Sequence, residues 1–418
     1  MVFCCDISNM KRITECRICK NKGIKEFFNL GDQPFANSLL KNPNEKENFY
    51  PLFLSWCPNC NLVQLNHTAE PKELFSNYVW VTATSKTAKE HAVNFYKDIL
   101  LRTENLHDEY ILEVASNDGT FLIPFVKNKY KVLGVDPAKN IVDMAIKNGV
   151  PTICGFFGEE LAREIIKEHG HAKVIFARNV VPHVANLHDF VKGLRECLDN
   201  DGLLVIEAHY ARKILKELHY DSIYHEHLCY FTLKSIEHLL NQYGLFIFDI
   251  KKSPISGGSM ILYIKKEKTK ENPIVQLYRE KEIKLNEFLS WKKFAERAYT
   301  HRDNLIKILK QIKDRNETIV GYGASARSST LLNFCGIDTK IISMIADQNP
   351  LKQGFYTAGT HIPIDSPEKV MENNPDYVCI LAWNFADEII DILRERFNYA
   401  GKFIIPLPNS PRIIGSYE

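Results

Sequence analysis

The segment YHEHLCYF, residues 224–231, places two histidines around a glutamate and ends in aromatic and thiol side chains. Histidine titrates near neutral pH, and a neighbouring carboxylate raises its basicity, so the segment fits an acid–base centre. A buried strand whose histidines are merely hydrogen-bonded fits as well. A metal site is disfavoured, because a histidine pair on a strand needs a third ligand and the sequence offers none that can be named. The acid–base and the structural interpretations both stay open at this stage.

Two CxxC pairs stand near the N-terminus, Cys16 with Cys19 and Cys57 with Cys60. Each CxxC turn can present two thiolates to one tetrahedral Zn²⁺, and two turns complete a Cys₄ site. The spacing between the pairs exceeds the usual ~15–20 residues, but the second pair carries the Pro-Asn of a tight turn and the region has few apolar residues with which to fold unaided. We therefore predict a structural zinc ion with no open position. Four unrelated buried thiols are the alternative.

Residues 111–120 read ILEVASNDGT, an apolar strand with an acidic residue followed by a turn. The next strand, VLGVD, ends in Asp136, and a carboxylate there suits the two hydroxyls of a ribose. Dinucleotide enzymes need GxGxxG so that a pyrophosphate meets bare backbone. This loop has one glycine, and Asp118 would repel a pyrophosphate and attract a cation. The pattern favours a methyl donor over a nicotinamide cofactor, with an ordinary strand–turn–helix corner as the alternative.

The third strand of the same region, KVIFAR, runs into Asn179 and His183. The carboxyl ends of parallel strands border the ligand crevice of an α/β sheet. We therefore expect His183 to face the site, with a purely structural histidine as the alternative.

The elements that must position these residues alternate between strand and helix. Apolar strands are expected at 110–116, 130–136, 172–178 and 202–208, and again at 317–324, 340–347 and 377–383. Between the two sets lies a charged stretch, residues 265–316, whose apolar residues recur at helical spacing and predict one or two long connecting helices. The fold class is therefore α/β, with two Rossmann-like sheets behind a small cysteine-rich module. The predicted boundaries are 1–72, 73–265 and 266–418.

Composition excludes several classes of function. The chain has 418 residues, 45% of them hydrophobic and 25% charged, with a net charge of +2. This balance gives no electrostatic reason to expect nucleic acid or an anionic membrane as a partner. No apolar run is long enough to span a bilayer, and the N-terminus lacks the order of a signal peptide. Eleven scattered cysteines favour a reducing compartment, so we expect a cytoplasmic protein.

The chain resembles the three-domain sugar C-methyltransferases. The resemblance covers nearly the whole sequence through the paired CxxC motifs, EVASNDG, RNVVPHV, YHEHLCYF, SGGSM and GYGASARSSTLLNFCGI, in the order of the family. It implies a zinc-binding N-terminal module, a central class I S-adenosylmethionine domain and a C-terminal Rossmann-like domain that helps to hold a nucleotide sugar. It implies methylation of a carbon next to the ketone of a nucleotide-diphosphate-linked 4-keto-deoxysugar, and a monomer is compatible with it. Methylation of oxygen or nitrogen is the alternative.

The family pattern Tyr-x-Glu-His falls on Tyr224, Glu226 and His227. By this resemblance His227 is the base, Glu226 orients it, and Tyr224 lies near the ketone oxygen. His183 matches the histidine that follows the third strand, and would stabilise the enolate as a donor. His225 would point away, by the alternation of an extended segment.

The resemblance and the strand ends together predict two binding sets. The cofactor set comprises Glu113, Ala115, Asn117, Asp118, Gly119, Asp136, Pro137 and Asn179. The substrate set comprises Tyr78, Gly257, Gly258, Ser259, Gly323, Ser325, Arg327, Ser328, Asn333, Lys352, Trp383 and Asn384. Ser325, Arg327 and Ser328 are expected at a diphosphate, whereas Trp383 either stacks on a base or belongs to the core. Trp80 stands where the family often has tyrosine, which bears on the identity of the sugar.

Overall fold

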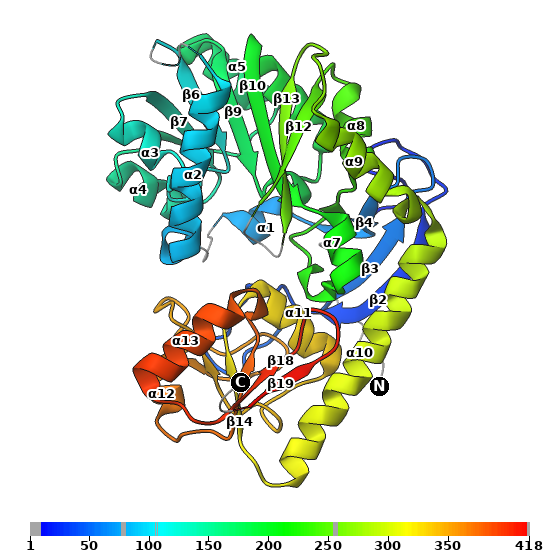
Figure 1. The fold of residues 1–418 in the computed structure, drawn as a ribbon, viewed down its shortest axis with the longest axis vertical. Helices are drawn as coiled ribbons and strands as arrows, with labels where there is room; N and C mark the ends of the chain where they lie inside the picture. The colour runs from blue at the N-terminus through cyan, green and yellow to red at the C-terminus, as the bar shows by residue number, and fades with distance from the viewer. Residues whose placement is uncertain (1–9, 77–80, 105, 107, 254–257, 416–418) are drawn as a thin grey trace.

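A computed structural model of the protein describes residues 10–76, 81–104, 106, 108–253 and 258–415. A large sheet with its helices occupies one part of the molecule and a second sheet the other (Figure 1). A smaller N-terminal sheet lies beside the long helix that connects them. The predicted α/β class is confirmed.

The N-terminal region is built from short antiparallel strands. They are β1 (Met10–Arg12), β2 (Lys25–Gln33), β3 (Tyr50–Trp56), β4 (Val63–Leu65) and β5 (His67–Ala69), followed by α1 (Pro71–Phe75). Strand β1 pairs with β5, and the other sheet has the order β11-β4-β3-β2. Strand β11 (Cys229–Tyr230) comes from the far end of the YHEHLCYF segment. The cysteine-rich module therefore anchors that segment through a backbone ladder.

The central sheet has the order β12-β13-β10-β9-β6-β7-β8. Its strands are β6 (Tyr110–Val114), β7 (Lys131–Asp136), β8 (Thr152–Cys154), β9 (Ala172–Arg178), β10 (Leu198–His209), β12 (Phe246–Lys252) and β13 (Ser259–Lys265). The strands from β10 to β8 are parallel, whereas β13 runs antiparallel to both β10 and β12. The inner strands are buried along nearly their whole length because helices cover both faces of a parallel sheet.

Helices and short 3₁₀ turns connect these strands. They are η1 (Thr82–Thr84), α2 (Lys86–Arg102), α3 (Ile123–Lys127), α4 (Lys139–Lys147), α5 (Glu159–His169), η2 (Val181–His183), α6 (Leu187–Cys197), α7 (Ala211–Glu217), η3 (Tyr220–Ser222) and α8 (Leu233–Asn241). The parallel strands end together at one edge of the sheet, so residues that follow β6, β7, β9 and β10 converge there.

A helical connector leads to the second α/β unit. It comprises α9 (Pro273–Lys281), η4 (Ile283–Asn286) and the 27-residue α10 (Phe288–Asp314), which runs along one side of the molecule from the upper to the lower sheet in Figure 1. The unit then contains β14 (Ile319–Tyr322), α11 (Ala326–Cys335), β15 (Ile345–Ala346), β16 (Ile364–Asp365), α12 (Pro367–Met371), β17 (Tyr377–Ile380), η5 (Trp383–Phe385), α13 (Ala386–Phe397), β18 (Lys402–Ile405) and β19 (Arg412–Ile414). Its sheet order is β16-β15-β14-β17-β18-β19. The boundaries between the three parts stay a prediction.

Candidate active site

The four cysteines of the CxxC pairs form one cluster. Sγ of Cys16 lies 3.4 Å from Sγ of Cys60, Sγ of Cys19 lies 3.4 Å from Sγ of Cys57, and all four sulfur atoms lie within 4.8 Å of one another. Tetrahedral Zn²⁺ with Zn–S bonds near 2.3 Å separates its sulfur ligands by about 3.8 Å. The donor set therefore fits zinc, and four protein ligands leave no position for a substrate.

Each half of the cluster has the same backbone turn. The N–H of Cys16 donates to the carbonyl of Asn21 at 2.9 Å, and the N–H of Cys57 donates to that of Leu62 at 2.9 Å. The residue that follows each pair has a positive φ, 59° at Lys20 and 62° at Asn61. This left-handed residue turns the chain back so that both sulfur atoms face the same point.

The YHEHLCYF segment is not extended at its start, contrary to the sequence prediction. The N–H of His227 donates to the carbonyl of Tyr224 at 2.9 Å, which closes a turn before strand β11 begins. The turn brings the side chains of Tyr224 and His227 together, with ring centroids 4.0 Å apart. His225 points elsewhere and contacts the carbonyl of Tyr50. Its exclusion from the site holds, but a turn is responsible rather than strand alternation.

Both ring nitrogens of His227 have hydrogen-bond partners. Nδ1 lies 2.7 Å from the carbonyl oxygen of Ser222, and Nε2 lies 2.8 Å from the hydroxyl of Tyr224. A carbonyl oxygen only accepts, so Nδ1 carries the proton and Nε2 accepts from Tyr224. The orienting group is therefore Ser222 and not Glu226, a correction to the sequence-based assignment. The carboxylate of Glu226 instead accepts a hydrogen bond from Asn37 at 2.5 Å.

Three histidines meet in this buried place. The ring of His227 lies 4.8 Å from that of His183 and 4.8 Å from that of His209. Burial lowers the pKa of His183 to about 4 and that of His209 to about 3, and it holds the pKa of His227 well below its ordinary value. All three imidazoles are therefore neutral at physiological pH. The cluster can accept a proton and can also donate hydrogen bonds to an oxyanion.

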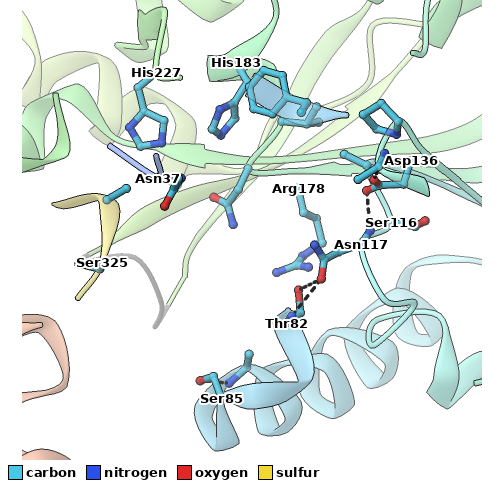
Figure 2. A pocket seen from close by; sticks show the side chains of 18 of the residues that line it. Asn37, Thr82, Ser85, Ser116, Asn117, Asp136, Arg178, His183, His227 and Ser325 are labelled. Carbon is cyan, nitrogen blue, oxygen red and sulfur yellow. Dashed lines mark hydrogen bonds between the residues drawn. The ribbon is translucent and has the colours of Figure 1, made fainter. Parts of the chain in front are cut away.

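The loop after β6 is tied to the end of β7 by a carboxylate. Oδ2 of Asp136 accepts from the N–H of Asn117 at 3.0 Å, and Oδ1 accepts from the N–H of Ala138 at 3.0 Å. Oδ1 of Asn117 in turn accepts from both the N–H and the hydroxyl of Thr82, at 2.9 and 3.0 Å. Asp136, Asn117, Thr82 and Arg178 lie together in Figure 2. The loop is thus fixed at two points.

Two members of the predicted cofactor set, Asp118 and Gly119, have their contacts within the loop and its neighbours. Asp118 is 1% exposed, and its carboxylate accepts from the N–H of Ala83 and the hydroxyl of Thr120. Gly119 has φ +79°, and a Cβ atom there would lie 2.7 Å from Val150. Asp118 and Gly119 therefore shape the loop, and the structure corrects their assignment as ligand-facing residues.

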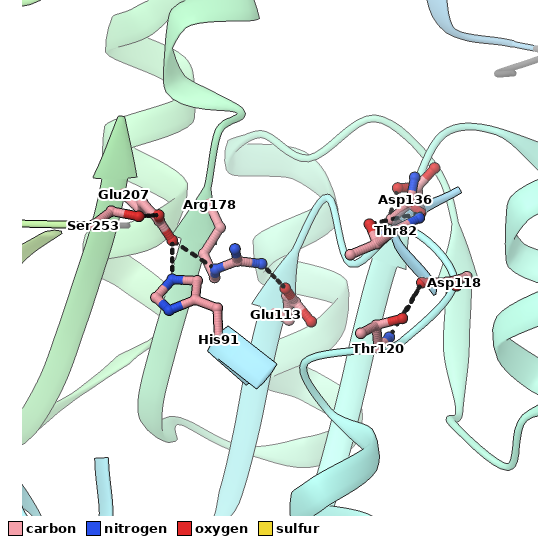
Figure 3. A network of polar contacts seen from close by, with 10 residues as sticks. Thr82, His91, Glu113, Asp118, Thr120, Asp136, Arg178, Glu207 and Ser253 are labelled. Carbon is pink, nitrogen blue, oxygen red and sulfur yellow. Dashed lines mark hydrogen bonds and ion pairs between the residues drawn. The ribbon is translucent and has the colours of Figure 1, made fainter. Parts of the chain in front are cut away.

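A polar network lies behind the loop (Figure 3). Nε of Arg178 donates to Glu207 at 2.9 Å, and Nη1 lies 3.8 Å from the carboxylate of Glu113. His91 and Ser253 also hydrogen-bond to Glu207. Burial raises the pKa of Glu113 well above its ordinary value. Arg178 therefore pairs mainly with Glu207, and the negative charge of an ionised Glu113 would be only partly compensated.

Several buried acceptor atoms beside the loop have no hydrogen-bond partner in the part of the chain that the structure describes. They include Oε2 of Glu113 and Oδ1 of Asn179. Unpaired buried acceptors are rare because each carries the full free energy of desolvation. Acceptors of this kind match the ammonium group and sulfonium centre of S-adenosylmethionine, so the residues present fit that cofactor.

One cavity of about 1030 Å³ contains these groups. From the predicted cofactor set it is lined by Glu113, Ala115, Asn117, Asp136, Pro137 and Asn179, and from the predicted catalytic set by Tyr224, His227 and His183. From the predicted substrate set it is lined by Gly323, Ser325, Arg327, Lys352 and Asn384. In Figure 2 Asp136 lies toward one side of this cavity, and His227 and Ser325 toward the other. The cavity thus connects the central sheet with the C-terminal sheet.

Other members of the substrate set are engaged elsewhere. Ser328 forms a reciprocal capping box with Ser325 at the start of α11 and is 1% exposed. The amide of Asn333 donates to the carbonyls of Ser329 and Ala358. Nε1 of Trp383 donates to Asp221 at 2.7 Å. Ser328, Asn333 and Trp383 do not line the cavity, because local hydrogen bonds already use their polar groups.

The described residues of the SGGS segment, Gly258 and Ser259, are held by other contacts. Ser259 pairs with His209 in the β10–β13 ladder and is 2% exposed. Gly258 has φ +102° and lies against Lys213. Neither residue lines this cavity, but Gly258 borders a small pocket with His209 and Arg327, and both assignments stay predictions. Tyr78, Trp80 and Gly257 lie outside the described residues.

Sequence reasoning missed His209, Arg178 and Asn37, which all line the cavity. His209 and Arg178 stand at the carboxyl ends of β10 and β9, the same signal that identified Asn179 and His183. That signal was available in the sequence. Asn37 had none, because it reaches the site only through the packing of the N-terminal module.

The fold and this site define a class I methyltransferase with a zinc module. Residues 16–75 match a zinc-binding domain model, residues 88–248 a methyltransferase domain, and residues 254–408 a C-methyltransferase C-terminal domain. The sequence is 32% identical over 414 residues to C-methyltransferase NovU of Streptomyces niveus, covering 97% of this chain and 98% of that protein. The chain belongs to the C-methyltransferase family, and it is an S-adenosylmethionine-dependent C-methyltransferase.

Solved structures match a smaller part of the chain. Magnesium protoporphyrin IX methyltransferase from Synechocystis PCC 6803 is 15% identical, with a TM-score of 0.33, and the match covers 43% of this chain and 79% of that one. A methyltransferase from Thermotoga maritima is 13% identical, with a TM-score of 0.34, and the match covers 44% and 90%. Among the helices of the described part of the chain, none combines the length and the apolar character that crossing a bilayer requires.

Proposed function

We propose that the protein methylates the carbon next to the ketone of a nucleotide-diphosphate-linked 4-keto-deoxysugar. The observation that carries the proposal is the buried pair of Tyr224 and His227, at 2.8 Å, in the cavity that also contains the cofactor loop. Methylation of carbon needs a base for a weakly acidic C–H bond, whereas methylation of oxygen or nitrogen does not. A neutral histidine in a single tautomer is such a base.

The base is Nε2 of His227, because Nδ1–H is committed to the carbonyl of Ser222 at 2.7 Å. With substrate bound, the Tyr224 hydroxyl rotates from Nε2 toward the ketone oxygen. Nε2 then takes the proton from the neighbouring carbon, and the electron pair of the C–H bond becomes the enolate. Tyr224, as a donor to the enolate oxygen, lowers the barrier to deprotonation.

His183 and His209 supply further donors near the same oxygen. Their low pKa values keep both imidazoles neutral, so neither repels protonated His227. Both histidines line the cavity, so either ring can face the substrate. Bound S-adenosylmethionine supplies the electrophilic methyl group that the carbanion carbon accepts.

The nucleotide portion is assigned to the C-terminal side of the cavity. Gly323, Ser325 and Lys352 line it there, and Lys352 is a cation that is 6% exposed. Single ligand sites commonly occupy about 300–1,000 Å³. A cavity of about 1030 Å³ therefore accommodates a cofactor and a sugar nucleotide whose reacting groups meet at the histidines.

Deuterium exchange tests the proposal. The protein is incubated in D₂O with a panel of nucleotide-linked 4-ketosugars, with and without S-adenosylmethionine, as wild type, His227→Ala, Tyr224→Phe and the control His171→Ala, an exposed histidine. We expect deuterium at the carbon next to the ketone, and a new C-methyl signal only with cofactor. His227→Ala loses both and His171→Ala loses neither. Absence of exchange and methylation on every ketosugar contradicts the proposed substrate and favours transfer to oxygen or nitrogen.

The pH dependence of the deuterium exchange rate is a second test of the proposal. Because burial holds the pKa of His227 well below its ordinary value, the base stays neutral as the pH falls below about 6.5, where an ordinary histidine becomes charged. We expect the exchange rate to hold its plateau through that range and to fall only at lower pH. A fall centred near pH 6.5 contradicts a buried base.

A further inference from the structure

The carbonyl of Ser222 determines which nitrogen of His227 is the base, so whatever holds this carbonyl also orients the base. Ser222 lies in the short turn η3 (Tyr220–Ser222). Its hydroxyl donates to the carbonyl of His219 at 2.7 Å and its carbonyl accepts from His227. Two backbone hydrogen bonds close the turn, from the N–H of Ser222 to the carbonyl of His219 and from the N–H of Ile223 to that of Tyr220, both at 3.1 Å. Further contacts to the turn come from distant segments.

An ion pair from the C-terminal unit holds the residue before Ser222. Arg327, in the first turn of α11, donates from Nε and Nη2 to the two carboxylate oxygens of Asp221, at 3.0 and 2.9 Å. Nε1 of Trp383, in η5, donates to the same carboxylate at 2.7 Å. The Asp221 side chain is 1% exposed. A bidentate pair with a third donor fixes both the position and the rotation of this carboxylate.

The residues on either side are held by the same unit and by the helical connector. The hydroxyl of Thr330, in α11, donates to the carbonyl of Ile223 at 2.9 Å. The hydroxyl of Tyr220 lies 3.0 Å from Nδ1 of His301 in α10. Residues 220, 221 and 223 thus each contact a segment that follows the central sheet in sequence, and Ser222 lies between them.

We propose that Asp221, Arg327 and Trp383 are positioning residues, through which the C-terminal unit holds the Ser222 carbonyl and so keeps His227 in its base-competent tautomer. The assignment rests on the proposed function of His227. It gives Arg327 and Trp383 a role other than binding the nucleotide: they align the base from the side on which the sugar nucleotide enters. Docking of the C-terminal unit and alignment of the base are then one structural event.

Charge adds a second consequence. Burial is the main cause of the low pKa of His209 and of His227, and the guanidinium of Arg327 lowers both further. Asp221 compensates that cation directly. Removal of the Asp221 charge therefore weakens the base as well as releasing the turn.

The test compares two tryptophan variants with the same chemical change. Trp383→Phe removes the N–H that contacts Asp221, while its ring still packs against Arg327, whose guanidinium lies 4.6 Å away. Trp291→Phe is the matched control, because its Nε1 donates to the carbonyl of Leu285 at 3.0 Å in another part of the molecule. Asp221→Asn and Arg327→Lys provide a second pair. Asparagine removes the charge of the carboxylate, and lysine keeps the positive charge but cannot form the bidentate hydrogen bond.

The first readout is the tautomer of His227 by ¹⁵N NMR of histidine-labelled protein, assigned by comparison with His227→Gln. We expect one Nδ1–H tautomer in wild type and in Trp291→Phe, and a mixture in Trp383→Phe and Asp221→Asn. An unchanged tautomer in both of these variants overturns the proposal. This readout needs no substrate, so it decides the inference even if no ketosugar is turned over.

The second readout is steady-state kinetics with the ketosugar identified by exchange. Loss of one hydrogen bond to a charged group predicts a fall in kcat of about tenfold for Trp383→Phe, with KM and S-adenosylmethionine affinity within about twofold of wild type. Asp221→Asn falls further, and Arg327→Lys recovers part of the activity lost in Arg327→Ala. A raised KM with unchanged kcat in Trp383→Phe overturns the inference and returns Trp383 to nucleotide stacking.

Discussion

The loops that follow the first strands of the two parallel sheets contain the same device. In the central sheet, Asp136 at the end of β7 accepts from the N–H of Asn117 in the neighbouring loop and from that of Ala138, two residues further on. In the C-terminal sheet, Asp347, directly after β15, accepts from the N–H of Ala324 at 2.8 Å and from that of Asn349 at 2.8 Å. A carboxylate at a strand end thus ties down the adjacent loop in both sheets.

The side chains beside the two carboxylates differ in kind. Near Asp136 are Oε2 of Glu113 and Oδ1 of Asn179, neither of which has a hydrogen-bond partner among the described residues. Near Asp347 is Lys352, whose Nζ donates to the carbonyl of Ala324 at 2.7 Å and lies 3.5 Å from the carboxylate. The same backbone arrangement therefore has different neighbours in the two sheets. In the central sheet it lies beside hydrogen-bond acceptors that suit a cation. In the C-terminal sheet it lies beside a buried lysine that compensates the carboxylate. We therefore infer that the flanking residues, and not the loop geometry, would separate the cofactor from the proposed sugar nucleotide.

The largest effect is expected from Asp136, the carboxylate that holds the loop after β6. Asp136→Ala removes two charge-assisted hydrogen bonds to the backbone, so we expect the affinity for S-adenosylhomocysteine to fall about a hundredfold, measured by calorimetry. Asp347→Ala is the matched control and leaves this affinity within about twofold. Equal losses in both variants would show that the loops are not independent and would break the comparison.

A smaller effect is expected from Lys352, the cation beside Asp347 in the C-terminal sheet. Lys352→Met retains the buried chain and removes the charge, so we expect binding of a nucleoside diphosphate to weaken about tenfold while binding of S-adenosylhomocysteine is unchanged. Lys340→Met, an exposed lysine of the same unit, serves as the control. If Lys352→Met instead weakens the binding of S-adenosylhomocysteine, the assignment of one ligand to each loop is contradicted.

The smallest effect concerns protonation of Glu113. Burial holds its pKa well above the ordinary value, so the ligand-free protein keeps this carboxyl protonated to higher pH than a typical glutamic acid, for which the pKa is about 4.3. A cationic cofactor stabilises the ionised form, so its affinity rises with pH as Glu113 loses its proton. Binding therefore releases a proton, measurable by calorimetry in buffers of different ionisation enthalpy.

Glu113→Gln should abolish that proton release and flatten the pH dependence, with a change in affinity of only a few-fold. Glu164→Gln, an exposed glutamate of α5, should retain both. If proton release persists unchanged in Glu113→Gln, another group is responsible, and the charge contrast between the loops no longer rests on Glu113.

Zinc ligands and strand ends could be predicted because they depend on short-range spacing. A CxxC turn brings two sulfur atoms together locally, so Cys16, Cys19, Cys57 and Cys60 were identifiable as one site. Asp136 and His183 were identifiable because the carboxyl ends of parallel strands meet at one edge. The same rule points to His209 at the end of β10.

The remaining contacts join residues far apart in the chain, and no local pattern encodes them. Arg327 reads in the sequence as an anion-binding residue, yet it pairs with Asp221. Glu226 reads as the partner of His227, yet Ser222 takes that role because the segment turns before it extends. A side chain with several possible partners is committed only when packing selects one of them.

The sequence by itself therefore determined the α/β class, the four zinc ligands and the cofactor edge of the central sheet, because these follow from periodicity and close spacing. Only the tertiary structure decided the tautomer of His227, the partner of Arg327 and the extent of the shared cavity. The physical reason is that hydrogen-bond partners and burial are properties of surfaces brought together from distant parts of the chain. Those surfaces exist only after the three parts of the molecule have packed.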